Sequence, residues 1–376
     1  MTPNGGIADA PIIIGGGPAG SAAAITLARA GYRPILIERT TGSTDKVCGD
    51  FLSADTIQRA RSLGVDPAAF GASPISRVRL IHGGWVAEAS LPFEAMGLSR
   101  RVLDAALLRA AEQEGADVRR GQNVRHLKRE ANDWLVQADE TLTTRTVFLA
   151  TGKHDLRDLP RPHTARDAIG MKMYFALPRE SARRLDGAVE LTLFPGGYAG
   201  MQNVEDGRTV LCLAVQRLAF QTLGGNWSAL VASIGQRSRR FGAMLDGATP
   251  LLPRPLAVAG IPYGYSPGSP PPDGLFRLGD QVAVIPSLTG DGMAIALHSG
   301  TIGAESWLAG GTAATYQKAL GFTLNRQMRL AHILHRACLS GWLQSAIVRS
   351  TALFPGAIAQ AGTLTRLPDE ARVTRR

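Results

Sequence analysis

Three glycines and one acidic residue near the start of the chain have the types and spacing of a nucleotide-binding turn. In PIIIGGGPAG, residues 11–20, Gly15, Gly17 and Gly20 fit the pattern G-x-G-x-x-G. The first glycine of this pattern makes a tight turn, the second lets a pyrophosphate approach the backbone, and the third lets a helix pack against a strand. Glu38 follows Gly20 by 18 residues, the spacing of an acid that accepts hydrogen bonds from a ribose. The alternative is a glycine-rich structural loop beside a surface glutamate, but the ordered set favours dinucleotide binding.

The elements that must position these residues can be predicted from the same stretch. Residues 12–14 are three isoleucines, which predict a short buried strand. Residues 19–30 predict a helix of small residues that ends at Gly31. Residues 33–37 predict a second strand that leads directly to Glu38. Strand, turn, helix and strand in this order indicate a Rossmann-like unit.

The rest of the chain separates into stretches of different character. Residues 99–112 have helical spacing, and residues 161–269 alternate strand-like runs with glycine and proline breaks. A proline-rich connector at residues 262–274 precedes another strand, loop and helix. Residues 311–376 are expected to be mainly helical. Two nucleotide-binding portions therefore bracket a mostly β region.

The bulk composition limits the class of protein. The chain has 376 residues, 45% of them apolar, and a net charge of +10. The basic residues are scattered and few aromatics accompany them, so nucleic-acid binding is not expected. An acidic carrier protein, an anionic membrane surface or an anionic substrate suits this charge, and simple solubility is the alternative.

The cysteines and the termini bear on compartment and metals. Cys48, Cys212 and Cys338 are widely spaced and odd in number, which argues for a reducing compartment and against a disulfide framework. His332 and His335 lie one helical turn apart without a third ligand nearby, so no metal site is expected. The first residues lack the features of a signal peptide, and no run of 18 apolar residues occurs. We expect a cytoplasmic protein, with peripheral attachment to a membrane as an alternative.

Four stretches, taken in order, resemble a known family. They are IIGGGPAG with Glu38, VCGDFLS at residues 47–53, SRRVLD at residues 99–104, and the segment LGDQVAVIPSLTGDGMAIALHSG. The chain resembles the FAD-dependent oxidoreductases of the para-hydroxybenzoate hydroxylase fold, particularly the geranylgeranyl reductase branch. The resemblance implies an α/β fold, in which a Rossmann-like FAD-binding domain is interleaved with a mostly β substrate domain and followed by C-terminal helices.

The resemblance also implies a set of FAD-binding residues. The Asp280 carboxylate is expected to hold the ribityl chain, and Arg100 to face the pyrophosphate or the flavin edge, with Arg101 as the alternative buried arginine. Asp291 is expected to cap the helix that begins near Gly292, whose amides would stabilise a reduced flavin. The full predicted set is Gly15, Gly17, Pro18, Ala19, Gly20, Glu38, Arg39, Cys48, Gly49, Arg100, Gly279, Asp280, Pro286, Gly290, Gly292 and Met293.

Two segments depart from the family pattern. The reductase branch carries an aromatic tyrosine-x-tryptophan-x-phenylalanine-proline segment; here Tyr198 is retained, but Gly200 replaces the tryptophan and Gln202 stands where a proline would follow. The hydroxylase branch carries an Asp-Gly segment linked to NAD(P)H use, and here Thr151 replaces its aspartate. We therefore expect NAD(P)H to reduce the flavin only as a transient visitor, or a partner protein to deliver the electrons.

The expected activity is oxidoreduction of a lipophilic small molecule by FAD. A monooxygenase that hydroxylates an electron-rich carbon is favoured, because the aromatic segment of the reductases is missing. The alternatives are a reductase of a carbon–carbon double bond, and a non-catalytic flavin-binding partner of a carrier protein or membrane assembly. Candidate catalytic residues are Cys48, Tyr198 and Gln202. An apolar, aromatic-poor set of residues suits an aliphatic or phenolic-lipid substrate, but ordinary core packing is the favoured interpretation of this set: Met171, Met173, Phe175, Leu193 and Phe194.

The expected domain boundaries follow from these assignments. The FAD-binding domain comprises residues 1–70, 99–160 and 273–325, and the substrate domain residues 71–98 and 161–272. Residues 326–376 form a C-terminal helical segment. Residues 326–350 are apolar with basic flanks and contain no acidic residue. This pattern predicts either a helix that closes the cavity or a surface that docks on an anionic partner.

Overall fold

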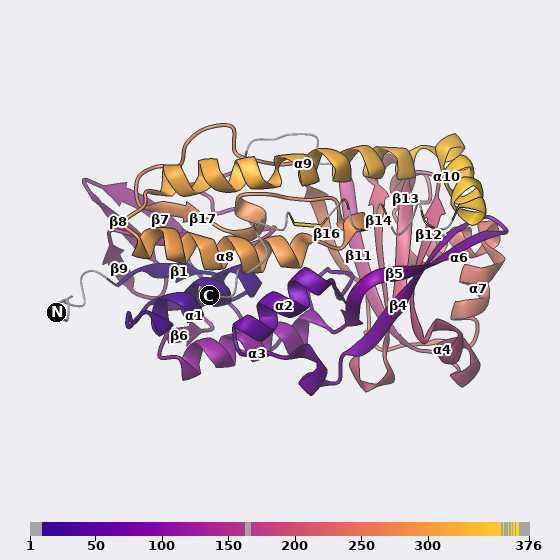
Figure 1. Cartoon of the computed structure of the whole chain (residues 1–376), viewed down its shortest axis with the longest axis horizontal. Coiled ribbons are helices and arrows are strands. Elements are labelled where there is room, and N and C mark those ends of the chain that lie inside the picture. The colour runs from indigo at the N-terminus through magenta and orange to yellow at the C-terminus, as the bar shows by residue number, and fades with distance from the viewer. Residues whose placement is uncertain are drawn as a thin grey trace.

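Two large β-sheets lie side by side along the long axis of the molecule, and a long helix spans both (Figure 1). The structure is a computed structural model that describes residues 10–161 and 167–354, together with Gly356, Gln360, Gly362, Leu364, Arg366 and Leu367. The fold is mixed α/β, as the sequence predicts. Among the described helices, none is both long enough and apolar enough to cross a bilayer.

The first sheet is parallel and contains the predicted nucleotide-binding strands. Ile12 pairs with Ile35 on one side and with Val147 on the other, so the first strand lies at the centre. The sheet order is β17-β10-β1-β2-β6, from segments far apart in the sequence. The strands are β1 (Ile12–Ile14), β2 (Ile35–Glu38), β6 (Asp117–Arg120), β10 (Val147–Leu149) and β17 (Leu275–Arg277).

This parallel sheet is covered on both faces, which explains why its central strand is fully apolar. Ile13 packs into the core formed by helices on one face, whereas Ile12 and Ile14 pack against Trp134 and Val136 on the other. The covering helices are α1 (Pro18–Arg29), α2 (Ala54–Ser62), α3 (Arg100–Gln113) and α8 (Gly292–Leu308). The opposite cover is a three-stranded antiparallel sheet of β7 (His126–Glu130), β8 (Asp133–Gln137) and β9 (Thr141–Thr144).

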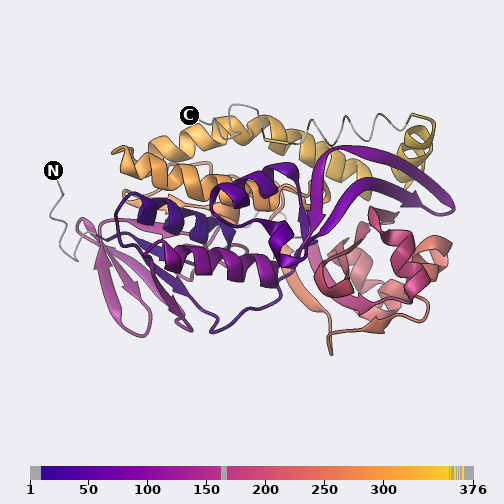
Figure 2. The ribbon, with the colours of Figure 1, turned by 60° about the horizontal axis from the view of Figure 1, so that its bottom comes forward.

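The second sheet is larger and mostly antiparallel. Its order is β15-β11-β14-β13-β12-β4-β5-β3, with β16 pairing on β11, and β12 runs parallel to β4. The strands are β3 (Phe51–Leu52), β4 (Ser73–His82), β5 (Trp85–Gly97), β11 (Ala168–Ala176), β12 (Gly187–Phe194), β13 (Gly197–Asn203), β14 (Thr209–Gln216), β15 (Thr249–Pro250) and β16 (Leu256–Ile261). β4 and β5 form a long hairpin that reaches toward the C-terminal helices (Figure 2).

Short helices cover the outer face of the second sheet. They are α4 (Arg179–Leu185), α5 (Arg217–Gln221), α6 (Trp227–Arg237) and α7 (Arg239–Leu245). Met171, Met173, Phe175 and Phe194 pack into one core cluster with residues of α6 and α7, and Leu193 packs into another. None of these five residues lines the main cavity. The favoured interpretation of core packing is confirmed and the alternative of a substrate lining is wrong, because four of these residues face the outer helices and Leu193 packs beside Tyr198 and Cys338.

Two helices close the molecule along one side. α9 (Ala313–Leu339) and α10 (Gly341–Leu353) are separated at Ser340, whose extended backbone (φ −85°, ψ 113°) interrupts the continuous helix that residues 326–350 suggest. α9 packs against α8 and β17 of the first sheet and against β12 and β13 of the second. This helix therefore braces the two sheets against each other.

Candidate functional site

The β1–α1 turn has the geometry that its glycines predict. Gly15 has φ +106°, and a Cβ there would lie 2.5 Å from the Ala150 carbonyl oxygen. A Cβ on Gly20 would lie 1.9 Å from the Gly15 carbonyl oxygen, so the helix can approach the strand only at a glycine. A Cβ on Gly17 would meet only the Arg100 guanidinium, at 3.5 Å. The first and third glycines are thus required by packing, whereas the second opens onto free space at the start of α1.

Glu38 ends β2 beside this turn and is buried. Its Oε2 accepts the Gly16 N–H at 2.7 Å, and its Oε1 accepts the backbone N–H and the hydroxyl of Thr40 at 3.0 and 2.8 Å. Burial opposes ionisation, but Lys46 and these hydrogen bonds together hold the pKa of Glu38 below its usual value. The carboxylate therefore supports the glycine turn as well as facing the cavity.

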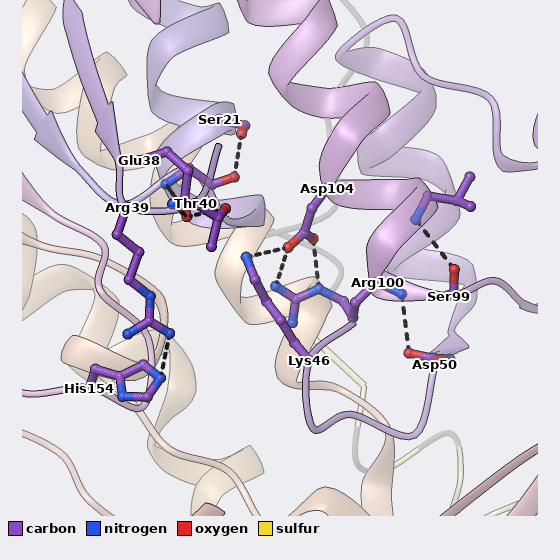
Figure 3. A network of polar contacts seen from close by, with 12 residues as sticks. Ser21, Glu38, Arg39, Thr40, Lys46, Asp50, Ser99, Arg100, Asp104 and His154 are labelled. Carbon is purple, nitrogen blue, oxygen red and sulfur yellow. Dashed lines mark hydrogen bonds and ion pairs between the residues drawn. The ribbon is translucent and has the colours of Figure 1, made fainter. Parts of the chain in front are cut away.

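Arg100, and not Arg101, points toward the glycine turn. Arg100 begins α3 and donates to both carboxylate oxygens of Asp104, at 2.7 and 2.9 Å, and Lys46 contacts the same carboxylate at 2.9 Å (Figure 3). Despite burial, Arg100 and Lys46 keep the pKa of Asp104 below its usual value. The Arg101 side chain is 41% exposed. Two fixed cationic groups therefore lie where a pyrophosphate would approach.

The predicted Arg39 lies at the other end of the same wall. Its guanidinium lies 2.9 Å from His154 Nε2 (Figure 3). Burial, and after it the charge of Arg39, keeps the pKa of His154 below its usual value, so the imidazole is neutral and accepts this hydrogen bond.

Asp280 and the start of α8 form the opposite wall. Asp280 lies 3.8 Å from Lys153 Nζ, and Arg161 donates to the Asp280 carbonyl at 2.8 Å. Lys153 is half-buried, and although this opposes its charge, Asp280 raises its pKa, so the lysine remains charged. Gly290 has φ +72° in the turn before α8.

Asp291 does not cap α8 with its side chain, and that expectation is wrong. Its carboxylate makes an ion pair with Arg366 near the C-terminus instead. Burial raises the pKa of Asp291 to about 6, against the opposing effect of Arg366. The N-terminus of α8 therefore has no side-chain cap, and the N-terminus of α1, which begins after Gly17, has none either.

A single cavity of about 1300 Å³ joins these walls. Of the predicted cofactor residues, Gly20 and Pro286 do not line it: Gly20 acts in packing α1, and Pro286 precedes the turn at Ser287–Thr289. The others that line it are Gly15, Gly17, Pro18, Ala19, Glu38, Arg39, Cys48, Gly49, Arg100, Gly279, Asp280, Gly290, Gly292 and Met293. These features fit FAD. The uncapped N-termini of α1 and α8 and the glycine turn suit its pyrophosphate and flavin ring, and the cations Arg100 and Lys46 suit the charge of the pyrophosphate.

The cavity continues into an apolar half beneath the second sheet. Its walls there include Val78, Leu80, Leu91, Phe93, Val189, Leu191, Cys212, Leu334 and Ile347. The candidate catalytic residues Cys48, Tyr198 and Gln202 all line the cavity. The Gln202 amide nitrogen is buried and has no hydrogen-bond partner among the described residues, whereas the buried Tyr198 hydroxyl interacts with the hydroxyls of Tyr263 and Ser287. The Gln202 amide on β13 is therefore free to bind a polar atom of a ligand, and the Tyr198 hydroxyl faces the same cavity.

Tyr263 adds a hydroxyl that sequence reasoning missed. Its Oη lies 2.6 Å from Ser287 Oγ, and both residues line the cavity near the turn that precedes α8. Burial raises the pKa of Tyr263 and that of Tyr198, so both phenols keep their protons at neutral pH. No catalytic motif marks Tyr263, which lies near the start of the predicted proline-rich connector.

A buried ion pair that the sequence did not reveal lies behind the cavity wall. Asp50 Oδ2 is 2.7 Å from Lys172 Nζ and accepts the Tyr174 hydroxyl at 2.6 Å, and both charged side chains are fully buried. Asp50 Oδ1 accepts the backbone N–H of Arg100 at 3.2 Å, and Lys172 also donates to the Lys46 carbonyl at 3.1 Å. The pair ties the Cys48–Gly49 loop and the start of α3 to β11.

Comparison with known families agrees with this geometry. Residues 10–147 match the family described as FAD binding domain, and residues 97–316 match the family described as FAD dependent oxidoreductase. The chain belongs to the FAD-dependent oxidoreductase family. FAD is the cofactor that these family matches support.

Relatives and solved structures extend the comparison. The menaquinone reductase of Mycolicibacterium smegmatis is 25% identical over 357 residues, which cover 86% of this chain and 85% of that protein. A flavin-dependent brominase has a TM-score of 0.78 at 16% identity, covering 96% of this chain and 95% of its own. A geranylgeranyl bacteriochlorophyll reductase-like protein of Thermoplasma acidophilum has a TM-score of 0.73 at 16% identity, with coverage of 96% and 94%. The structural likenesses establish the fold.

Proposed function

We propose that this FAD-dependent oxidoreductase reduces a carbon–carbon double bond in a lipophilic substrate that carries a polar head and a long unsaturated chain. The observation that carries the proposal is the continuity of the cavity, which passes from the predicted FAD-binding residues into an apolar half that holds the unpaired Gln202 amide nitrogen and the Tyr198 hydroxyl. Such a site suits a mostly hydrocarbon ligand with a single polar anchor. The names of the relatives, a menaquinone reductase and a digeranylgeranylglycerophospholipid reductase, support this substrate class.

Tyr198 and Gln202 would orient this substrate. Both side chains are almost fully buried, and leaving the Gln202 amide nitrogen without a partner costs free energy that a bound carbonyl or hydroxyl recovers. Apolar contacts with Val78, Leu191 and Leu334 would hold the chain of the substrate and exclude water. The polar head would thereby fix which double bond lies against the cofactor.

Tyr263 would hold the proton that double-bond reduction requires. Its hydroxyl remains protonated and is hydrogen-bonded to Ser287, which can replace a donated proton. Burial raises the pKa of Cys212 to about 12 and that of Cys338 to about 11, so these two thiols also stay protonated, but neither has the hydroxyl partner that Tyr263 has in Ser287. When bound, FAD supplies the hydride, and NAD(P)H is proposed as the reductant that renews it.

Hydroxylation is the second candidate, and Gly200 is the observation that favours it. The tryptophan of the reductase branch is absent here, and a Cβ at Gly200 would meet Leu191 at only ordinary contact distance, 3.5 Å. The cavity wall therefore carries no bulky side chain at this point, which would leave more of the cavity to the ring of a phenolic substrate than a tryptophan would.

Product mass separates the two activities. Purified holoenzyme would be incubated with NADPH and either a polyprenyl quinone or a lipophilic phenol, with and without oxygen. A gain of two hydrogens that persists without oxygen supports reduction, whereas a gain of one oxygen that requires oxygen supports hydroxylation. Tyr198→Phe and Gln202→Leu should raise KM for the quinone more than they lower kcat. Formation of neither product with either substrate class would contradict the proposal.

A further inference from the structure

The outer faces of α9 and α10 carry apolar side chains that the fold does not cover. Phe322, Ile333, Trp342, Leu353 and Phe354 are 64–87% exposed, and they are five of the six most exposed large apolar side chains among the described residues. Single exposed apolar residues are ordinary, but a concentration on adjoining elements indicates an interaction surface.

Arginines share this surface with the apolar side chains. Phe322, Arg326, Arg329, Ile333 and Arg336 follow one another at steps of four and three residues, so they lie on one face of α9. All five are exposed. We call this stripe, together with Trp342, Arg349, Leu353 and Phe354 on α10, the α9–α10 surface.

The charge of the α9–α10 surface is uniformly positive. No aspartate or glutamate occurs in residues 306–368, which contain Lys318 and five arginines. Arg326, Arg329 and Arg336 form no ion pair with any described residue, in contrast to buried arginines such as Arg79, which contacts Glu190 at 2.9 Å. A row of unpaired arginines with protruding aromatic and aliphatic side chains is typical of an interfacial helix on an anionic bilayer.

The same two helices also form part of the cavity wall. Leu334 and Cys338 of α9 and Ile347, Ser350 and Thr351 of α10 line the cavity from within. Ser350 is exposed, so the cavity reaches the surface of the molecule beside α10. A lipophilic ligand that leaves a bilayer at this point would enter the cavity without crossing bulk water.

The tip of the β4–β5 hairpin extends the surface beside α10 (Figure 2). Trp85 is 50% and Val86 39% exposed, and the Arg349 guanidinium lies 5.0 Å from the Trp85 ring centroid. Tryptophan and arginine are favoured at the level of lipid headgroups.

We propose that the α9–α10 surface docks on an anionic membrane and that the substrate enters the cavity from that membrane beside α10. The second clause rests on the proposed function, whereas the docking itself does not. A bilayer fits this surface better than a carrier protein, because the apolar side chains protrude singly among arginines and can insert between lipids.

Vesicle co-sedimentation of the holoenzyme tests the docking. We expect binding to phosphatidylglycerol-containing vesicles at low salt, weaker binding at high salt, and little binding to pure phosphatidylcholine. The variant R326Q/R329Q/R336Q should bind about fivefold more weakly per arginine, on the order of 100-fold in total. Trp342→Ser should weaken binding at both salt concentrations, since it removes an apolar contact.

A matched triple variant separates this surface from net charge alone. R179Q/R237Q/R239Q removes three exposed arginines from α4, α6 and α7 and should leave vesicle binding within about twofold of wild type. Equal losses in both triple variants, no binding to anionic vesicles, or binding only to an acidic protein would each overturn the proposal. FAD absorbance and thermal unfolding establish that each variant is folded. Because sedimentation does not measure turnover, a failed docking result leaves the product-mass test unaffected.

Discussion

Individual residues of the FAD site have roles that go beyond contact with the cofactor. Glu38 illustrates this, because its carboxylate accepts hydrogen bonds from the glycine turn and from Thr40 while it faces the cavity. The residue can therefore affect both the shape of the turn and the binding of a ribose.

Glu38→Gln should weaken FAD binding by about 1–3 kcal/mol, because an amide accepts fewer and weaker hydrogen bonds than a carboxylate. Fluorescence titration of apo protein with FAD measures this loss. Asp139, an exposed carboxylate outside the cavity, supplies the control Asp139→Asn, which should leave the affinity unchanged. An unchanged affinity in Glu38→Gln would show that Glu38 is not the ribose ligand.

Removing one partner of the buried Asp50–Lys172 pair should lower the stability of the protein far more than removing both. Asp50→Asn leaves the Lys172 charge buried without a counter-charge and should lower the free energy of unfolding by about 3–5 kcal/mol. The double variant Asp50→Asn with Lys172→Met should recover part of this loss. Urea unfolding of wild type, Asp50→Asn, Lys172→Met and the double variant completes a double-mutant cycle. Losses of stability that simply add up would contradict strong coupling of the two residues.

At the scale of elements, local sequence patterns predicted those helices, strands and turns that depend on residues close together in the chain. The glycine turn, Glu38 and the start of α3 depend on short stretches of sequence, and the structure has each element where the spacing predicts it. Strand β11 shows where this fails. It is buried along both faces, so alternation offered no polar side to orient it, and a cavity lining stayed open as an alternative for Met171 and Met173, which pack in the outer core.

Contacts between distant segments could not be predicted at all. Asp50 meets Lys172, and Asp291 meets Arg366, across separations that no spacing rule covers. The first pair forms only when the second sheet packs against the loop that contains Asp50, and the second only when Arg366 packs against the start of α8. The sequence likewise gives no sign that Ser340 ends α9, since helical periodicity continues across it.

Helix α9 should make the protein sensitive to acid through His335. This imidazole is buried beside Tyr198 and Tyr263, and burial lowers its pKa from 6.5 to about 4. Its contribution to stability is therefore complete above pH 6.5 and is lost as the pH falls toward 4, by about 3 kcal/mol in total. Urea unfolding between pH 7 and 4 should show a shallower decline in His335→Gln than in wild type. Identical slopes would mean that His335 takes up its proton without a cost to folding.

At the scale of the whole molecule, the chain crosses between the two sheets several times. Strand β3 joins the second sheet before α3 returns to the first, and β17 returns to the first sheet after β16. The shared core, the Asp50–Lys172 pair and α9 all couple the two parts.

This interleaving predicts a single cooperative unfolding transition for the apo protein. Far-UV circular dichroism and tryptophan fluorescence should give the same urea midpoint. Trp134 reports on the first sheet and Trp227 on the outer helices of the second, so single-tryptophan variants can compare the two. Midpoints that differ reproducibly would show that the two sheets unfold independently.

The length of α9 also limits how the enzyme can move. Its 27 residues span about 40 Å and pack on strands of both sheets. A hinge between the sheets would have to bend this rod or detach one of its ends, each at the expense of buried contacts. A large closing motion of one sheet toward the other is therefore disfavoured. The width of the cavity between the two sheets is fixed by the folded structure. Helix α10 is held as well, since it packs on β4 and β5 and its buried Gln344 donates to the Phe194 carbonyl at 2.7 Å. Ligand traffic is therefore left to small local displacements of side chains that line the cavity.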